Sequence, residues 1–228
     1  MKIYSIHYNK PEYIKIQNDT IKKYVNFDHE FIIVNNACDN EMRASINQSS
    51  ELLELRTIQC NNSIKELSSI SHQNSFKYII DDFKDGDDVM IIDHDLFLMD
   101  YLNTSYYDKY DMTMLPLNPW QNGIRGSIEY PWPGLIIFNK VKNKEQISFS
   151  SGSVENQPCD TGGHLYYYIK NNNLNIKRIS ESSLETDELL MSSLDNIFLH
   201  LISGSGWNKN YNLESKINLM LNKLNING

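Results

Sequence analysis

Residues 89–100 read VMIIDHDLFLMD, and the architecture of the chain can be inferred by working outward from them. Four apolar residues, Val89–Ile92, lead directly into Asp93-His94-Asp95, after which apolar residues resume. Burying a carboxylate is costly unless it is paired or bound to a metal ion. We therefore expect a buried strand that leaves the core at its acidic end, where the two acids either cap the next turn or hold something positively charged.

The first hundred residues alternate between segments with strand character and segments with helix character. Pro11 fits the first turn of the first helix, because its missing N–H is not needed there. The expected strands are residues 2–8, 31–34, 55–58 and 89–92. Such alternation predicts a parallel sheet with crossover helices, in which ligands gather at the carboxyl ends of the strands. Tyr8, Asn36 and Asp93 would then face one crevice.

The second half of the chain has a different character, with a loop rich in Pro, Gly and Trp at residues 116–134. Further strands are expected at 112–115, 135–138 and 175–179, and helices at 162–170 and in the tail from Leu213 to Leu224. No repeat and no clear linker separates the two halves. The sequence therefore predicts an α/β fold in one domain, with a mixed, mainly parallel sheet flanked by helices.

Composition and charge narrow the class of partner. The 228 residues carry a net charge of −8, whereas proteins that bind nucleic-acid backbones carry basic patches. The three cysteines, Cys38, Cys60 and Cys159, are widely spaced, which favours neither a disulfide framework nor a zinc site. No apolar run has the length of a membrane span, and the first residues lack the apolar stretch of a signal peptide. We expect a cytoplasmic protein without a nucleic-acid partner and without a membrane span.

The acids Asp93 and Asp95 are the leading candidates for a metal site. Two carboxylates separated by one residue can hold Mg²⁺ or Mn²⁺ and leave coordination positions for phosphate oxygens. The spacing is weakly specific, because a second copy, Asp85-Gly86-Asp87, falls in a polar turn. Capping of the turn after the strand stays open as the alternative for Asp93 and Asp95.

His200 is the candidate third ligand. It lies in the apolar segment FLHL, and Ser203-Gly204-Ser205-Gly206 follows shortly after it. Backbone N–H groups of a Gly/Ser loop approach phosphate oxygens closely, and an imidazole among carboxylates shifts the preference from Mg²⁺ toward Mn²⁺. A buried histidine closed off by glycine turns is the alternative.

Asp160 and the tryptophan-containing loop are candidates for chemistry on an acceptor. Asp160 precedes two glycines at an expected helix start, where it can act as a general base or as a helix N-cap. The loop from Trp120 to Trp132 offers aromatic faces of the kind that bind sugars, although a proline-stiffened surface loop has the same composition. Both interpretations stay open for each feature.

Six segments stand out in order along the chain: YSIHYNKPEY at 4–13, EFIIVNNA at 30–37, VMIIDHD at 89–95, WPGLIIFNK at 132–140, CDTGGHLYYYI at 159–169 and FLHLISGSGW at 198–207. Together they resemble nucleotide-sugar-dependent glycosyltransferases of the GT-A fold, which is Rossmann-like. The likeness covers residues 1–207. It is nearest to small GT-A enzymes of large DNA viruses, such as the chlorovirus rhamnosyltransferase-type domain, and to bacterial surface-glycan transferases.

The resemblance implies roles for the acids and for His200. Asp93 would contact the ribose or the metal, Asp95 would be the main metal ligand, and His200 would close the coordination. The implied cofactor is Mn²⁺, with Mg²⁺ as the second choice. Asp160 matches the approximate place of the catalytic base in members that invert the anomeric centre.

The resemblance also implies a donor site for a nucleoside-diphosphate sugar. Tyr8 and Asn36 would lie near the nucleobase, and Ser205 and Trp207 would line the diphosphate. Many relatives carry an acid where this chain has Asn36, so the base stays open between uracil and guanine, with UDP-sugars favoured.

These roles divide the chain into a nucleotide-binding half at 1–100, an acceptor-binding half with the metal-closing segment at 101–207, and a C-terminal helix at 208–228. The expected activity is transfer of a hexosyl or deoxyhexosyl group from the donor to a glycan hydroxyl. Such an enzyme would serve surface or viral glycan synthesis, and it would work in the host cytoplasm if the protein is viral.

Three other functions stay open. A nucleotidyltransferase could use the same sheet and metal, but it normally needs a basic, glycine-rich loop after the first strand, and HYNKPEY at 7–13 contains no glycine. A metal-dependent phosphohydrolase would act on the donor without an acceptor. A non-catalytic glycan-binding module would keep the fold without the chemistry.

Overall fold

The structure is a computed structural model that describes residues 1–61, 68–121, 124–184, 191–201 and 213–224. In chain order its elements are β1 (Lys2–His7), α1 (Glu12–Tyr24), β2 (Glu30–Asn35), α2 (Asn40–Glu51), β3 (Arg56–Gln59), α3 (Ser68–Asp82), β4 (Val89–Asp93), β5 (Leu96–Leu98), β6 (Met112–Leu117), β7 (Trp120–Gln121), β8 (Ile124–Arg125), β9 (Tyr130–Phe138), β10 (Gly152–Val154), β11 (Gln157–Cys159), α4 (Leu165–Asn172), β12 (Ile176–Arg178), β13 (Glu181–Ser183), β14 (Met191–Leu194), β15 (Phe198–Leu201) and α5 (Leu213–Leu224).

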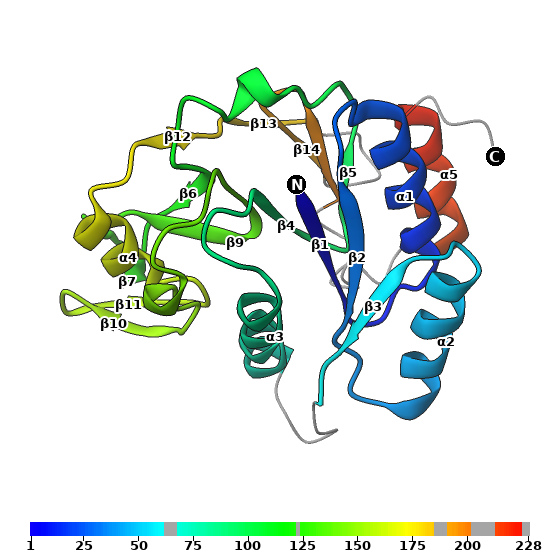
Figure 1. The fold of residues 1–228 in the computed structure, drawn as a ribbon, viewed down its shortest axis with the longest axis horizontal. Helices are drawn as coiled ribbons and strands as arrows, with labels where there is room; N and C mark the ends of the chain where they lie inside the picture. The colour runs from blue at the N-terminus through cyan, green and yellow to red at the C-terminus, as the bar shows by residue number, and fades with distance from the viewer. Residues whose placement is uncertain (62–67, 122–123, 185–190, 202–212, 225–228) are drawn as a thin grey trace.

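A seven-stranded sheet forms the centre of the molecule, in the order β12-β6-β9-β4-β1-β2-β3 (Figure 1). Its strands pair in parallel except β9, which runs antiparallel to both β4 and β6. Strands from both halves of the chain join this one sheet, so the prediction of a mixed, mainly parallel α/β fold is confirmed.

Both faces of the sheet are covered by helices because successive side chains of each strand point in opposite directions. On β1, Ile3 packs with Ile14 of α1, whereas Tyr4 packs with Phe76 of α3 and with Phe83, which directly follows that helix. Figure 1 shows the same arrangement, with α1 and α2 on one side of β1 and β2 and α3 on the other. The near-continuous apolar runs of the inner strands follow from this burial on two faces.

A second sheet has four short antiparallel strands in the order β13-β14-β15-β5. The chain reaches it immediately after Asp93, the last residue of β4, because β5 begins at Leu96. The segment Asp93–Leu96 therefore connects the two sheets. Sequence patterns did not predict this sheet.

The region of residues 116–138 differs most from the expectation. The strand expected at 135–138 begins at Tyr130, and the loop expected at 116–134 contains β7, β8 and the start of β9. Pro116 pairs in register with Pro131, next to an irregularity in the β6–β9 ladder. Proline can occupy a strand where its missing N–H is not needed for the ladder, so proline content was a poor sign of a loop here.

The tail helix expected from Leu213 to Leu224 is confirmed as α5. Its Ile217, Leu221 and Leu224 pack in a cluster with Tyr13 of α1 and Phe97 of β5. Among the described residues, none of the helices combines the length and apolar character that crossing a membrane would need.

Candidate functional site at the carboxyl edge of the sheet

Three neighbouring strands end in polar residues at one edge of the central sheet. In the register of β4, β1 and β2, Asp93 lies opposite Ile6, and His7 lies opposite Asn35. The side chains that follow these strands are therefore brought to one place, as the parallel arrangement predicts. We take this carboxyl edge as the candidate site.

His200 lies beside the Asp93–Leu96 segment although it is more than a hundred residues away in sequence. It pairs in register with Leu96, and the backbone N–H of Leu201 donates to the carbonyl oxygen of Asp95 at 2.9 Å. The ring of Trp132, on β9, lies 4.7 Å from the His200 ring. The Nδ1 atom of His200 is buried and has no hydrogen-bond partner among the residues that the structure describes.

The two aspartates occupy different electrostatic environments. Asp95 is 6% exposed, and burial raises its pKa to about 7; the nearby His200 lowers this pKa, and the charge of Asp93 raises it. Burial disfavours the charge of Asp93 too. The charge and hydrogen bond of His72 outweigh that effect and lower the pKa of Asp93. At neutral pH one carboxylate is ionised and the other is poised between its two states.

His72, on α3, is a site residue that sequence reasoning missed. Its Nε2 lies 3.0 Å from Oδ1 of Asp93. Burial alone would lower the pKa of His72, but the charge of Asp93 and the hydrogen bond with it raise that pKa overall, and the charge of Asp160 adds to the effect. The available signal was helical spacing, because His72 continues the series Phe76, Ile79 and Phe83 that faces the sheet.

Asp93, Asp95 and His200 supply donor atoms that suit a divalent cation such as Mn²⁺. Two observations fit such an ion: the Nδ1 of His200, which has no partner among the described residues, and the Asp95 carboxyl, whose burial disfavours its charge. However, no three His, Cys, Asp or Glu side chains within the described ranges already converge closely enough to hold a metal ion. Oδ1 of Asp93, which would be needed as a metal ligand, is instead hydrogen-bonded to Nε2 of His72.

The residues expected near a nucleobase also lie at this edge. Asn36 is buried directly after β2, and the hydroxyl of Ser71, on α3, donates to its Oδ1 at 3.2 Å. Tyr8 is half-buried after β1, and burial together with the nearby Cys38 thiol raises its pKa. Ser205 and Trp207, expected along the diphosphate, lie outside the described residues.

Asp160 is exposed at the start of a turn before α4. The backbone N–H of Thr161 donates to its Oδ1 at 2.7 Å, and the N–H of Gly163 donates to its carbonyl oxygen at 2.9 Å. The helix expected from Gly162 begins at Leu165 instead, because Gly162 has φ +90°, outside the helical region. Asp160 is therefore a turn residue, and its charge acts on His72 of the site.

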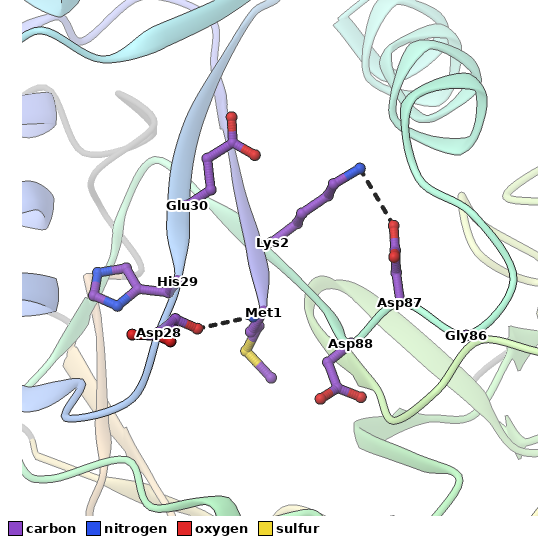
Figure 2. A pocket seen from close by; sticks show the side chains of 8 residues that line it. All are labelled: Met1, Lys2, Asp28, His29, Glu30, Gly86, Asp87 and Asp88. Atoms are coloured by element: carbon purple, nitrogen blue, oxygen red, sulfur yellow. Dashed lines mark hydrogen bonds and ion pairs between the residues drawn. The ribbon is translucent and has the colours of Figure 1, made fainter.

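A hollow of about 390 Å³ lies at the opposite edge of the sheet, where β1, β2 and β4 begin (Figure 2). It includes Gly86 and Asp87 of the second Asp-x-Asp, which is a turn as expected: Asp87 accepts from the N–H of Lys84 at 3.0 Å. Lys2 forms an ion pair with Asp87 at 3.2 Å, so the Asp87 carboxylate already has a positively charged partner within the chain. We place no site there.

No family model matches the chain, and no curated protein matches it. Among solved structures it is similar to enzymes that handle sugars and nucleotide sugars, and its sheet is that of the GT-A fold. A mannosyltransferase, PcManGT from Pyrobaculum calidifontis, solved with GDP-Man and Mn²⁺, has a TM-score of 0.51 and 12% identity over 78% of this chain and 53% of its own. That likeness establishes the fold and nothing finer.

Two further structures are less similar. The galactosyltransferase LgtC, solved with donor and acceptor sugar analogues, has a TM-score of 0.45 and 16% identity over 67% of this chain and 62% of its own. A nucleoside-diphosphate-sugar pyrophosphorylase from Vibrio cholerae has a TM-score of 0.46 and 10% identity over 78% of this chain and 91% of its own. The chain thus spans less than two thirds of either transferase.

Proposed function

We propose that the chain is a metal-dependent glycosyltransferase that moves a hexosyl or deoxyhexosyl group from a nucleoside-diphosphate sugar to a glycan hydroxyl. The observation that carries this proposal is the placement of Asp93, Asp95 and His200 on neighbouring backbone segments at the carboxyl edge of the sheet, although their side chains do not converge closely enough to hold an ion in the described structure. The mannosyltransferase of the same fold, solved with GDP-Man and Mn²⁺, supports a donor and an ion of this kind. UDP-sugars are the favoured donors and GDP-sugars the second choice.

Asp93, Asp95 and His200 would hold Mn²⁺, or Mg²⁺ in its absence. When bound, the ion supplies positive charge that stabilises the departing diphosphate. Asp93 would give up its contact with His72, and Asp95 would give up its proton. Tyr8 and Asn36 would bind the nucleobase, and Ser205 and Trp207 would line the diphosphate.

Asp160 would act as the general base. Its exposed carboxylate would accept the proton of the acceptor hydroxyl while that oxygen attacks the anomeric carbon. The bond from this carbon to the diphosphate oxygen would break on the opposite side, so the anomeric centre would be inverted. The bonding electrons would leave with the nucleoside diphosphate. A role in surface or viral glycan synthesis rests on the sequence resemblance.

Calorimetry with UDP and GDP, each with and without Mn²⁺, tests the proposal. We expect one nucleotide to bind in the presence of the ion and Asp95→Asn to weaken that binding at least tenfold. Asp87→Asn is the matched control, because it makes the same change in the other Asp-x-Asp, and it should bind as the wild type does.

Each rival predicts a different result. A nucleotidyltransferase would bind a nucleoside triphosphate in preference to a diphosphate, and a phosphohydrolase would consume a nucleotide sugar equally fast without acceptor. A non-catalytic glycan-binding module would bind neither nucleotide. Any of these outcomes would contradict the transferase.

A further inference from the structure

The side chain of Gln17 is a fully buried amide in the middle of α1, on the side of the helix that faces the sheet. Its Nε2 donates to the carbonyl oxygens of Asp93 and Leu96, both at 2.8 Å. Its Oε1 accepts from the Ser5 hydroxyl at 2.6 Å and lies 2.9 Å from Nε2 of His7. Both N–H groups and the oxygen of this amide are therefore used.

The orientation of this amide is fixed by its neighbours. Burial lowers the pKa of His7 to about 3, and the nearby His94 adds to the effect, so the His7 ring is neutral. Because the two carbonyl oxygens hold the amide nitrogen, Oε1 of Gln17 can only accept, and we assign the ring proton of His7 to Nε2 on that ground. Two donors, Ser5 and His7, thus face the oxygen, and two carbonyl oxygens face the nitrogen. Turning the amide over would set donor against donor and acceptor against acceptor.

The Asp93–Leu96 segment depends on partners outside itself. Gln17 binds its first and last carbonyl oxygens, and Leu201 binds the carbonyl oxygen of Asp95 between them. Gln17 therefore ties the end of the central sheet to the start of the four-stranded sheet. An apolar side chain at position 17 would fill the core without that link.

We propose that Gln17 is a positioning residue that holds the Asp93–Leu96 segment in the shape that presents the two carboxylates to a divalent cation. The inference rests on the proposed function for its metal, and it adds a residue that touches neither metal nor substrate. Groups that orient ligands from behind commonly change metal affinity by about 10- to 100-fold.

Two variants isolate the role of the donors. Gln17→Glu keeps the acceptor for Ser5 and His7 and, as a buried protonated acid, can donate to only one of the two carbonyl oxygens. Gln17→Met removes all four hydrogen bonds at similar volume. In both we expect the Mn²⁺ concentration for half-maximal UDP or GDP binding to rise at least tenfold. Saturating Mn²⁺ should restore nucleotide binding, which it would not do for an unfolded chain. Ile14→Val, which trims a buried side chain of the same helix, should leave the Mn²⁺ requirement unchanged.

Hydrogen exchange in the metal-free protein supplies a second readout. We expect the backbone N–H groups of residues 94–96 to exchange at least tenfold faster in Gln17→Met, while those of β2 stay as in the wild type. Ser5→Ala, which removes one partner of the amide, should shift the same groups in the same direction by less and serves if both Gln17 variants fail to fold.

The outcomes separate the two proposals. If the wild type binds a nucleotide with Mn²⁺ and the Gln17 variants need no more Mn²⁺, the role of Gln17 is refuted and the transferase stands. If the wild type binds no nucleotide under any condition, the proposed function is refuted, and unchanged exchange at residues 94–96 would refute the positioning role as well.

Discussion

Asp95 is an acid in an environment that disfavours its charge. Its pKa lies near 7 because it is buried, with Asp93 close by, and His200 only partly compensates. An unfolded Asp ionises near pH 3.8. Between these two values the folded protein binds one more proton than the unfolded chain, so the metal-free protein loses stability as pH rises from about 4 to 7.

Asp95→Asn should therefore stabilise the metal-free protein at pH 7, by at most about 3–4 kcal/mol, and leave it unchanged at pH 4. The amide has the shape of the acid but no charge to bury. Thermal unfolding in the presence of a chelator, across this pH range, measures the difference. If the melting temperature of the variant at pH 7 is no higher than that of the wild type, burial does not raise the pKa of the Asp95 carboxyl.

Asp160→Asn should lower kcat by about 10²- to 10⁴-fold, because an amide cannot accept the proton of the acceptor hydroxyl. Nucleotide binding should stay as in the wild type, since Asp160 binds neither the metal nor the nucleotide in the proposed roles. Initial rates with a nucleotide sugar and a glycan acceptor, together with calorimetry on the same sample, provide the test. Normal turnover by a folded variant would remove Asp160 from the mechanism.

At the residue scale the sequence singled out Asp93, Asp95 and His200, whose role as metal ligands stays a prediction, but it did not single out His72 or Gln17. The first three interrupt apolar strand segments, where polar side chains are conspicuous. Both missed residues lie on helices, where an occasional polar side chain within an apolar face is ordinary. Their importance follows from tertiary contacts that no local pattern encodes.

At the scale of the elements, the turn before α4 depends on Gly162. Its φ of +90° is unfavourable for any residue with a Cβ, and a Cβ there would lie 2.8 Å from the carbonyl oxygen of Pro131 on β9. Gly86 has the same φ, but nothing lies within 4 Å of its Cβ position. The two glycines differ in their surroundings and not in their backbone conformation.

Gly162→Ala should consequently destabilise the protein more than Gly86→Ala does. Backbone strain alone costs about 1 kcal/mol, which is the whole effect expected at Gly86. At Gly162 the clash with β9 should bring the loss to roughly 2–4 kcal/mol. Chemical denaturation measures the free energy of unfolding of both variants. Equal losses would show that the turn at Gly162 shifts to accommodate a Cβ at no additional cost.

The four strands of the first half that join the central sheet were predictable because each carries its own apolar residues. The four-stranded sheet was not, since β13 is Glu181–Ser183 and β14 contains Ser192 and Ser193 between apolar residues. Such segments form strands because partners such as β15 are available, and that information is not local. The meeting of His200 with Asp95 depends on this sheet.

At the scale of the whole molecule, Arg56 joins three elements at the exposed side of the sheet. From β3 it makes two 2.7 Å hydrogen bonds to Asp82 of α3 and one to Glu30 of β2. The hydrogen bonds from Arg56 lower the pKa of Asp82 to about 2 against the opposing effect of burial, and the hydroxyl of Tyr4 contributes. Asp82 therefore adds stability above pH 4 that is lost as pH falls toward 2.

Arg56→Met should lower stability at pH 7 by about 1–2 kcal/mol, a range reduced because Arg56 is partly exposed. The difference from the wild type should shrink as pH approaches 2. Arg178→Met is the matched control, because Arg178 makes a single 2.6 Å bond to Glu129 at a more exposed position and should cost less than about 0.5 kcal/mol. Equal losses from both substitutions would contradict the bridging role of Arg56.

The passage of the chain from one sheet to the other at Asp93–Leu96 has a consequence for mutational scans. Leu194 and Phe198 are fully buried and pack in the same apolar layer as Ile92 and Leu96, so they help to set the angle between the two sheets. We expect that trimming either side chain would loosen the packing of the two sheets at the point where the acids lie. Under the proposed function, substitutions at Leu194 and Phe198 should lower turnover, as substitutions of the two aspartates do. Only the substitutions at Leu194 and Phe198 should also lower the amount of folded protein, so a scan that measures abundance would distinguish the two groups.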